Sequence, residues 1–270
     1  MDLALTPDPA AADLERRFGG LRRLYGSEAY ERIRAARAAV VGIGGVGSWT
    51  AEALARSGVA QLVLIDLDHI AESNINRQVH ALDTTLGASK VQALRERIAL
   101  IHPGCEVIGV EEFVEPGNWP QLLPGPVDVV IDCCDQARAK LAMAAWSMSS
   151  GTPLVSVGAA GGKHRAQDVD VADLADTSHD PLLASLRQRL RREHGAARKG
   201  QIGITCVFSR EPIARPFESC DLDGSLNCHG YGSVVSVTAT FGMVAAGEAI
   251  RVLAWDCRPL ATARAESALQ

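Results

Sequence analysis

The chain has 270 residues, of which 47% are apolar and 22% charged, and its formal net charge is −5. This length suits one large α/β domain with an elaborated C-terminal part, and the acidic balance excludes a generally basic nucleic-acid binder while leaving room for a local basic patch. The seven cysteines are irregularly spaced and form no CxxC pair, so we expect neither a disulfide framework nor a structural zinc site. The polar N-terminal segment has no apolar signal-peptide core, which favours a cytoplasmic protein with reduced thiols.

Helical and strand-like patterns alternate along the first 160 residues. Residues 10–36 are charged and helical in pattern, and the Gly19-Gly20 pair is expected to break that segment. Hydrophobic periodicity then predicts, in chain order, a strand at 38–43, a helix at 46–57, a strand at 61–65, a helix at 86–101, strands at 106–110 and 127–131, a helix at 136–150 and a strand at 153–157. This order predicts right-handed βαβ units, and hence a Rossmann-like, mostly parallel α/β sheet with helices on both faces.

The pattern changes after residue 158 and becomes rich in loops. The remaining expected elements are a turn at 159–162, a basic helix at 181–194, a strand-like run at 202–208 within loops at 195–232, and an apolar helix at 232–254. The chain is therefore divided into an N-terminal helical segment (1–36), an ATP-binding core (37–160) and a C-terminal extension of the same domain (161–270).

The last apolar segment is long enough to span a membrane. It contains Glu248 and Arg251, however, and a charge inside a membrane costs on the order of 3 kcal/mol. We therefore expect residues 232–254 to form a buried or dimer-interface helix rather than a membrane span.

A glycine-rich turn follows the first predicted strand, and it contains the GxGxxG pattern. Glycines at these positions permit a tight turn and a close approach of the backbone to phosphate, and the next helix points its free N–H groups at the anion. Asp66 ends the second predicted strand, where its carboxylate would accept hydrogen bonds from a ribose. The set indicates a dinucleotide or ATP site whose backbone contacts are Gly42, Gly44, Gly45 and Gly47.

Charged residues beyond this turn favour ATP over NAD. Arg77 and Lys90 add two cations near the predicted phosphate site. Asp132 and Asp135 follow a later strand, at the sheet edge where ligands of such folds bind. Cations and carboxylates around one phosphate pocket are typical of phosphate chemistry with Mg²⁺ rather than of hydride transfer.

Four motifs in this order resemble the adenylation domain of the ubiquitin-activating (ThiF/MoeB-like) superfamily. They are the GxGGxGS turn, the acidic strand end, the NINRQ run with its downstream lysine, and the IDCCD run. The resemblance covers about residues 14–160, and it implies that ATP-Mg²⁺ activates a carboxylate as an acyl-adenylate. Cys133 is a departure, because these enzymes usually have a small apolar residue there.

The resemblance also implies roles for individual residues. Asp66 would hold the ribose, Arg77 and Lys90 would stabilise charge in the transition state, and Asp132 would hold Mg²⁺. The other residues expected to line the nucleotide are Asp68, Asn74, Asn76, Gln78 and Asp135. Arg17, in a motif before the first strand, would reach the γ-phosphate bound by a partner subunit, which implies a homodimer.

Segments across nearly the whole chain, from residue 16 to about 253, resemble the tRNA threonylcarbamoyladenosine dehydratases. They are RFGGLRRLYG, IGGVGSWTAEALARSG, NINRQVHAL, VGAAGG, DPLLASLRQRLRREHG and TCVFSRE. This resemblance implies that ATP converts the carboxylate of threonylcarbamoyladenosine in tRNA to an acyl-adenylate, with release of pyrophosphate. The carbamoyl group of the same side chain would then close a ring and expel AMP, so that one water is lost.

Basic residues around the predicted helix at 181–194 could bind the tRNA backbone. They are Arg187, Arg189, Arg191, Arg192, Arg198 and Lys199. Two alternatives stay open at this point. The chain could adenylate the C-terminus of a ubiquitin-like or sulfur-carrier protein, with Cys228 as a nucleophile and a sulfur-transfer partner, or it could be an NAD-binding oxidoreductase. A monovalent cation beside the nucleotide is also left open by the sequence.

Overall fold

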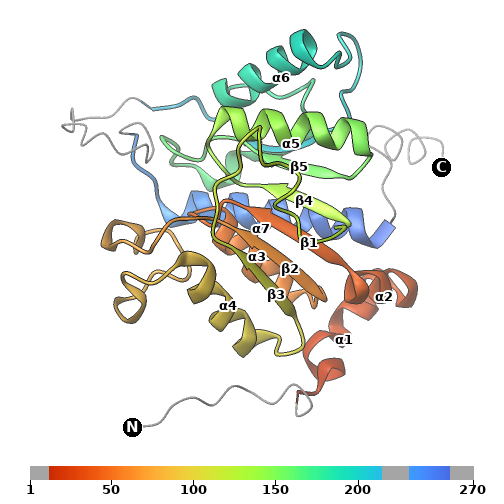
Figure 1. Ribbon diagram of the computed structural model, residues 1–270, viewed down its shortest axis with the longest axis vertical. Helices are drawn as coiled ribbons and strands as arrows, with labels where there is room; N and C mark the ends of the chain where they lie inside the picture. Colours follow the sequence, from red (N-terminus) through yellow and green to blue (C-terminus); the bar gives the residue numbers. More distant parts are fainter. Residues whose placement is uncertain (1–11, 215–230, 256–270) are drawn as a thin grey trace.

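The computed structural model describes residues 12–214 and 231–255. Its centre is a seven-stranded sheet with the order β3-β2-β1-β4-β5-β7-β6, in which only β6 runs antiparallel, to β7 (Figure 1). The strands are β1 (Arg37–Val41), β2 (Gln61–Ile65), β3 (Glu106–Val110), β4 (Val129–Asp132), β5 (Leu154–Val157), β6 (Val169–Asp173) and β7 (Thr205–Ser209). The α-helices are α1 (Leu14–Tyr25), α2 (Ser27–Ala35), α3 (Gly47–Arg56), α4 (Lys90–Ile101), α5 (Ala137–Ser150), α6 (Pro181–Glu193) and α7 (Val235–Trp255).

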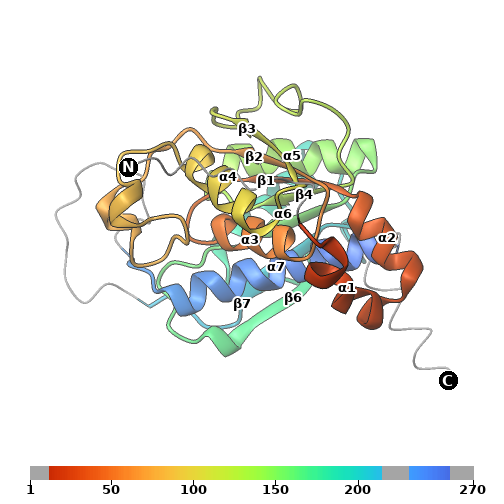
Figure 2. The same ribbon diagram turned by 90° about the horizontal axis from the view of Figure 1, so that it is seen from below.

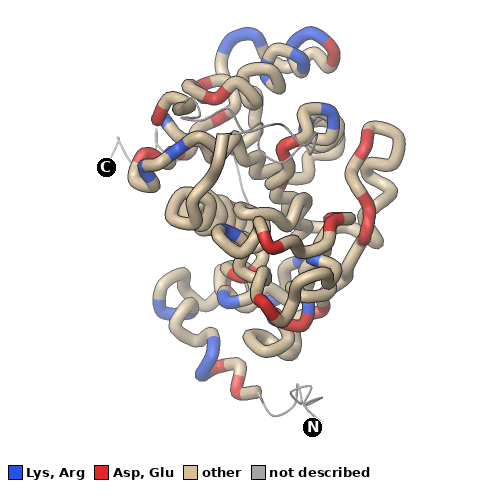
Figure 3. Tube along the Cα trace, turned by 90° about the vertical axis from the view of Figure 1, so that its left-hand side faces the viewer, with Lys and Arg blue, Asp and Glu red and all other residues tan. Residues whose placement is uncertain are grey.

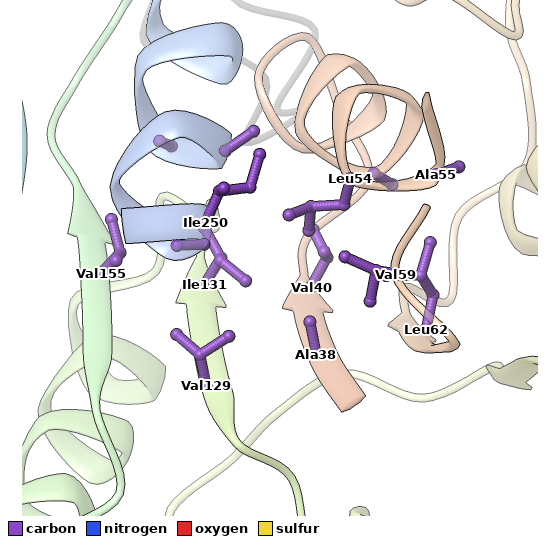
Figure 4. Packing of buried hydrophobic residues seen from close by; sticks show 14 of the residues in the cluster. Ala38, Val40, Leu54, Ala55, Val59, Leu62, Val129, Ile131, Val155 and Ile250 are labelled. Atoms are coloured by element: carbon purple, nitrogen blue, oxygen red, sulfur yellow. The ribbon is translucent and has the colours of Figure 1, made fainter. Parts of the chain in front are cut away.

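Both faces of the sheet are covered by helices, as the uninterrupted apolar strands predict. In β1, Ala38 and Val40 face one layer, whereas Ala39 and Val41 face the other. Helices α3, α4 and α7 pack on the first face, and α5 and α6 pack on the second (Figure 2). Figure 4 shows part of the first layer, where Ile250 of α7 lies over Ile131 of β4. Each such side chain contributes about 1.5–3 kcal/mol when fully buried.

The long apolar helix α7 crosses α3 at Gly242. A Cβ atom at Gly242 would lie 2.6 Å from the carbonyl oxygen of Val46 and 2.8 Å from the Cβ of Trp49, so only glycine permits this approach. Of the described helices, α7 alone is long and apolar enough to cross a membrane, but 61% of its most apolar window is buried. The predicted final apolar helix is therefore present.

Two expectations about the elements are wrong. α1 continues through Gly19 and Gly20 and ends at Gly26, whose φ of +83° is left-handed. A glycine inside a helix costs only about 1 kcal/mol, and here the burial of Phe18 holds the helix together. The sequence also predicts no strand between the turn at 159–162 and the helix at 181–194, yet β6 forms there by pairing with β7.

Candidate active site

The glycine-rich turn joins β1 to α3 at the carboxyl edge of the sheet. Gly42 has a φ of +80°, and a Cβ atom there would lie 2.9 Å from the backbone nitrogen of Cys134. A Cβ at Gly47 would collide with the carbonyl oxygen of Gly42. Among the described residues, no atom accepts the backbone N–H of Gly44 or Gly45. The turn thus leaves free N–H donors at a helix N-terminus, which is an arrangement suited to phosphate.

Asp66 lies directly beside this turn, at the end of β2. Its Oδ2 accepts a hydrogen bond from the backbone N–H of Ile43 at 2.6 Å, and its Oδ1 accepts one from Asp68 N–H at 2.9 Å. Burial raises the pKa of the Asp66 carboxyl, while the nearby Lys90 charge acts to lower it. The carboxylate is therefore fixed in place by the backbone, with lone pairs left for hydroxyl donors.

Lys90 begins α4 and faces the same carboxylates. Its Nζ donates to Asp68 Oδ2 at 2.6 Å and lies 4.0 Å from Asp66 Oδ1. The Lys90 side chain is almost fully buried, so its charge acts at low dielectric. The structure thus brings Lys90 together with the two carboxylates of the acidic strand end, which the sequence places in a separate motif.

The loop that carries Arg77 and Gln78 closes over the glycine turn. The aliphatic part of Arg77 packs on Gly45, and Trp49 Nε1 of α3 donates to the Arg77 carbonyl oxygen at 2.9 Å. Arg77 Nη1 donates to Ser73 O at 2.7 Å. Gln78 is buried next to Gly44, and its Oε1 has no hydrogen-bond partner among the described residues. An orphaned buried oxygen at this point fits a bound ligand that supplies a donor.

The two asparagines of this loop form hydrogen bonds within the protein. Asn74 is buried, and its Oδ1 accepts a hydrogen bond from Ala71 N–H at 3.1 Å. Asn76 Nδ2 donates to the carbonyl oxygen of Ser233, which ties the loop to the segment before α7.

Asp132 and Asp135 have different surroundings. Asp132 has no exposed surface, and its Oδ2 accepts hydrogen bonds from Lys140 Nζ at 2.9 Å and Ser156 Oγ at 2.8 Å. Its Oδ1 accepts from the Cys134 backbone and thiol at 3.3 and 3.0 Å. Both oxygens are therefore occupied inside the protein. Asp135 is exposed in the loop that follows β4, at the same edge as the glycine turn.

Lys140 is a residue that the sequence interpretation missed. Its side chain is completely buried, and its Nζ also donates to the carbonyl oxygen of Val157 at 2.6 Å. Burial acts to lower the pKa of Lys140, but the Asp132 carboxylate outweighs burial and raises it. The available signal was a lysine one turn into α5, a helix with no other charge after it.

The raised pKa values of the two cysteine thiols at this edge disfavour a nucleophilic role. Burial raises the pKa of the Cys133 thiol to about 12, so the thiol stays protonated near neutral pH. Cys134 donates its S–H to Asp132, and burial raises the pKa of its thiol as well. Cys228 lies outside the described residues.

Arg17 lies on α1, far from the glycine turn of its own chain. Its Nη1 donates to the carbonyl oxygen of Ile101 at the end of α4, and α1 and α2 precede β1 beyond the opposite edge of the sheet (Figure 1). A five-residue strand separates the two edges by roughly 16 Å.

Lys and Arg residues occur on and beyond α6, and Figure 3 marks such positions in blue at the top of the trace. Arg189 and Arg192 both pair with Glu193. Within residues 12–214, Arg198 and Lys199 are exposed and form no ion pair. Arg187 instead turns back toward the loop before α6, where its Nη1 donates to three oxygens of Leu174 and Thr177.

Comparison with known proteins agrees with this geometry. A model of the ThiF family matches residues 17–267. The chain is 42% identical to the tRNA threonylcarbamoyladenosine dehydratase of Escherichia coli and 40% identical to that of Haemophilus influenzae, in each case over 87% of this chain and 92% of the relative. The crystal structure of the E. coli enzyme in complex with ATP matches with a TM-score of 0.81 at 40% identity, over 96% of this chain and 98% of that one.

A molybdopterin-synthase adenylyltransferase is a more distant relative. The molybdopterin-synthase adenylyltransferase of Salmonella typhimurium is 28% identical, over 88% of this chain and 80% of that protein. The chain therefore belongs to the ThiF family and, within it, to the tRNA threonylcarbamoyladenosine dehydratases.

Proposed function

We propose that this protein dehydrates threonylcarbamoyladenosine in tRNA with the energy of ATP. The carboxylate of the modified base attacks the α-phosphate of ATP and pyrophosphate leaves, which gives a carboxyl-adenylate. The carbamoyl group of the same side chain then attacks the activated carbonyl, loses a proton and expels AMP, so that the ring closes with net loss of one water. The observation that carries this proposal is the free N–H pair of Gly44 and Gly45 beside Asp66, Arg77 and Lys90 at one edge of the sheet.

The residues at this edge would have different roles according to their charge. The N–H groups of the glycine turn would bind phosphate oxygens, and Asp66 would accept hydrogen bonds from the ribose hydroxyls. Arg77 and Lys90 would stabilise the negative charge that develops as pyrophosphate leaves. Gln78, with its unpartnered Oε1, would add a polar contact to the nucleotide.

Mg²⁺ would neutralise phosphate charge at this site. In the described ranges no cluster of three or more histidine, cysteine or acidic side chains could hold a metal alone. This fits Mg²⁺, which commonly binds one or two carboxylates together with substrate phosphates. We assign its carboxylate to Asp135 rather than to Asp132, because Asp135 is exposed at the carboxyl edge whereas Asp132 already satisfies both oxygens with Lys140, Ser156 and Cys134.

The nucleophile of the second step belongs to the substrate. Holding carbamoyl and carbonyl groups of one side chain together supplies much of the rate by proximity. The reaction therefore requires no enzyme thiol, and Cys228 is assigned no catalytic role. A monovalent cation and a sulfur-transfer partner are likewise not needed by this scheme.

We further propose that the enzyme works in the cytoplasm as a homodimer. Arg17 is too far from its own glycine turn to contact nucleotide there, so it would act on the site of a partner subunit. In this arrangement the partner subunit, and not the chain that binds the nucleotide, would supply the cation at the γ-phosphate.

A single-turnover assay tests the reaction. Wild-type protein, ATP-Mg²⁺ and tRNA that carries threonylcarbamoyladenosine should give AMP, pyrophosphate and a nucleoside that is lighter by one water. Asp135→Asn should keep its fold and slow adenylate formation by about 100-fold or more, with a raised Mg²⁺ requirement. ATP–pyrophosphate exchange that ignores tRNA but requires a small carrier protein would instead establish a carrier-activating enzyme.

A further inference from the structure

We propose that a cavity between the start of α6 and the end of β7 binds an unpaired nucleobase of the tRNA, next to the modified adenosine. The cavity measures about 400 Å³. It is lined by Pro181, Ala184 and Arg187 of α6, His179 in the preceding loop, and Pro212 and Ile213 beyond β7. This inference rests on the proposed function, because it names how the same enzyme holds its RNA.

The location of the cavity fits a substrate that reaches the glycine turn. The loop before α6 is tied to the end of β5, because Asp180 Oδ2 accepts a hydrogen bond from Ala159 N–H at 2.8 Å. Since β1, β4, β5 and β7 are parallel, the cavity and the glycine turn share one edge of the sheet. Two to three strand spacings separate them, which is roughly 10–15 Å. Nucleotides that flank the reacting adenosine would lie within that distance.

The chemistry of the lining fits a planar base. Two prolines, Ala184 and Ile213 supply apolar walls, and the imidazole of His179 supplies a ring on which a base can stack. His179 has a φ of +56°, in the left-handed region that a non-glycine residue seldom occupies. Such strain is characteristic of positions held for a purpose, and here the loop places His179 at the cavity.

Arg187 adds a fixed hydrogen-bond donor. Its Nη1 is anchored by Leu174 O, Thr177 O and Thr177 Oγ1 at 2.8–3.0 Å. Its Nε and Nη2 donate to no atom of the described residues, and the residue lines the cavity. A guanidinium held at one corner presents its remaining N–H groups in a fixed plane, which suits the acceptors of a base edge or an adjacent phosphate.

The charge of the surroundings favours RNA as the occupant. Beyond Arg187 the same helix carries Arg191 and Arg192, and Arg198 and Lys199 follow its end. A strand that leaves the cavity along α6 would meet cations that bind its phosphates. The cavity therefore lies at the start of a helix whose later turns carry cations for the phosphates of a bound strand.

The test uses a substitution that fills the cavity with a larger side chain and removes none of the polar groups that line it. Ala184→Tyr fills it from an exposed helical position, and Ser185→Tyr, on the same helix but outside the lining, is the matched control. KM for tRNA, kcat, and KM for ATP are measured with tRNA bearing threonylcarbamoyladenosine, and with the same tRNA made abasic at each flanking nucleotide in turn. One abasic site should raise the KM of wild-type enzyme for tRNA by about tenfold, because a stacked base is lost.

The effects of Ala184→Tyr and of that abasic site on KM for tRNA should not add. Ala184→Tyr should raise KM for tRNA by about tenfold with intact tRNA and show no further rise with that abasic tRNA, while Ser185→Tyr behaves as wild type. KM for ATP should stay unchanged in both variants, which also shows that they fold. His179→Ala is a second variant in case Ala184→Tyr fails to fold, and it should show a smaller loss on the same nucleotide.

Two outcomes would overturn the inference. An unchanged KM for tRNA in Ala184→Tyr would mean that RNA does not enter the cavity and that it serves another partner, such as a protein. Additive effects of Ala184→Tyr and every abasic site would mean that no base occupies it. A wild-type enzyme that leaves threonylcarbamoyladenosine unchanged would instead refute the proposed function, so the two failures are distinguishable.

Discussion

Lys140 and Asp132 form a buried pair that links the ends of β4 and β5. The pair has no exposed surface, and Lys140 reaches the Val157 carbonyl oxygen as well as the Asp132 carboxylate. Charges taken out of water in this way stabilise little by themselves, but each is costly once its partner is removed. The pair also fixes the start of the loop that carries Asp135, so its effect extends to the site.

Lys140→Met should lower the free energy of unfolding by about 3–5 kcal/mol, because Asp132 is left as an uncompensated buried charge. Urea denaturation measures this loss. The double variant Lys140→Met/Asp132→Asn should recover part of it, since neither charge is then unpaired. Equal destabilisation by Lys140→Met and Lys140→Met/Asp132→Asn would show that packing, not the unpaired carboxylate, dominates.

At the scale of elements, the approach of α7 to α3 depends on one missing side chain. α3 carries the glycine turn at its N-terminus, so α7 supports the phosphate site from behind. Thr50 Oγ1 donates to the carbonyl oxygen of Gly242 at 3.2 Å, which marks the crossing point. Any side chain at Gly242 would press on the backbone of Val46 and Thr50.

Gly242→Ala should destabilise the protein by about 1–3 kcal/mol, despite the better helix propensity of alanine, because the new methyl group meets backbone atoms that cannot move away. KM for ATP should rise in the same variant. Gly247→Ala on the same helix is the control: a Cβ there has nothing within 4 Å, so alanine should stabilise by about 0.5–1 kcal/mol. Thermal and chemical unfolding of both variants, at one protein concentration, give the comparison.

The sequence predicts the parallel part of the sheet well and its far edge poorly. The predicted strands at 61–65 and 106–110 coincide with β2 and β3, because both are short apolar runs bounded by turns, although β2 is buried and β3 is a partly exposed edge strand. β6 was not predicted. It is short and acidic, with Asp170 and Asp173, and it exists only by pairing with β7, more than 30 residues later. Local periodicity carries no information about that partner.

The difference between Asp132 and Asp135 is also invisible in the sequence. Asp132 ends the strand and Asp135 follows it, and the family resemblance gives the metal to Asp132. Burial separates them: the side chain that is still within the strand faces Lys140, and the one three residues later is in the exposed loop. The positions of the glycine turn and of Asp66, by contrast, could be predicted from the local sequence pattern. The backbone geometry at the end of a strand places them, and no distant residue is needed.

At the scale of the whole molecule, two buried histidines make stability depend on pH. Burial lowers the pKa of His80 and of His102 to about 4, and neighbouring cations such as Lys90 and Arg34 act in the same direction. In the unfolded chain a histidine has a pKa of about 6.5. The unfolded state therefore binds protons first as pH falls, so stability is fully present above about pH 6.5 and is lost progressively toward pH 4.

His80→Leu should flatten this dependence. The fall in the free energy of unfolding between pH 7 and pH 5 should shrink by about 2 kcal/mol relative to wild type, because one of the two neutral buried histidines is gone. Urea denaturation at both pH values measures the change. His194→Leu, at an exposed position, should leave the difference between the two pH values as in wild type. An unchanged fall in His80→Leu would show that folding does not lower the pKa of His80.

In the proposed homodimer, Arg17 connects the fold of one chain to the chemistry of the other. Its place on α1, against the end of α4, puts it at the opposite edge of the sheet from the glycine turn, so we propose that it serves a nucleotide across the dimer interface. Arg17→Ala and Lys90→Ala should each be inactive alone. In a mixed dimer, however, the Lys90→Ala subunit supplies an intact Arg17 to the intact site of the Arg17→Ala subunit. Random exchange of equal amounts should thus restore about one quarter of the wild-type rate, because half of the dimers are mixed and each has one complete site. No recovery, in mixtures shown by mass to contain mixed dimers, would mean that Arg17 acts within its own subunit or only on stability.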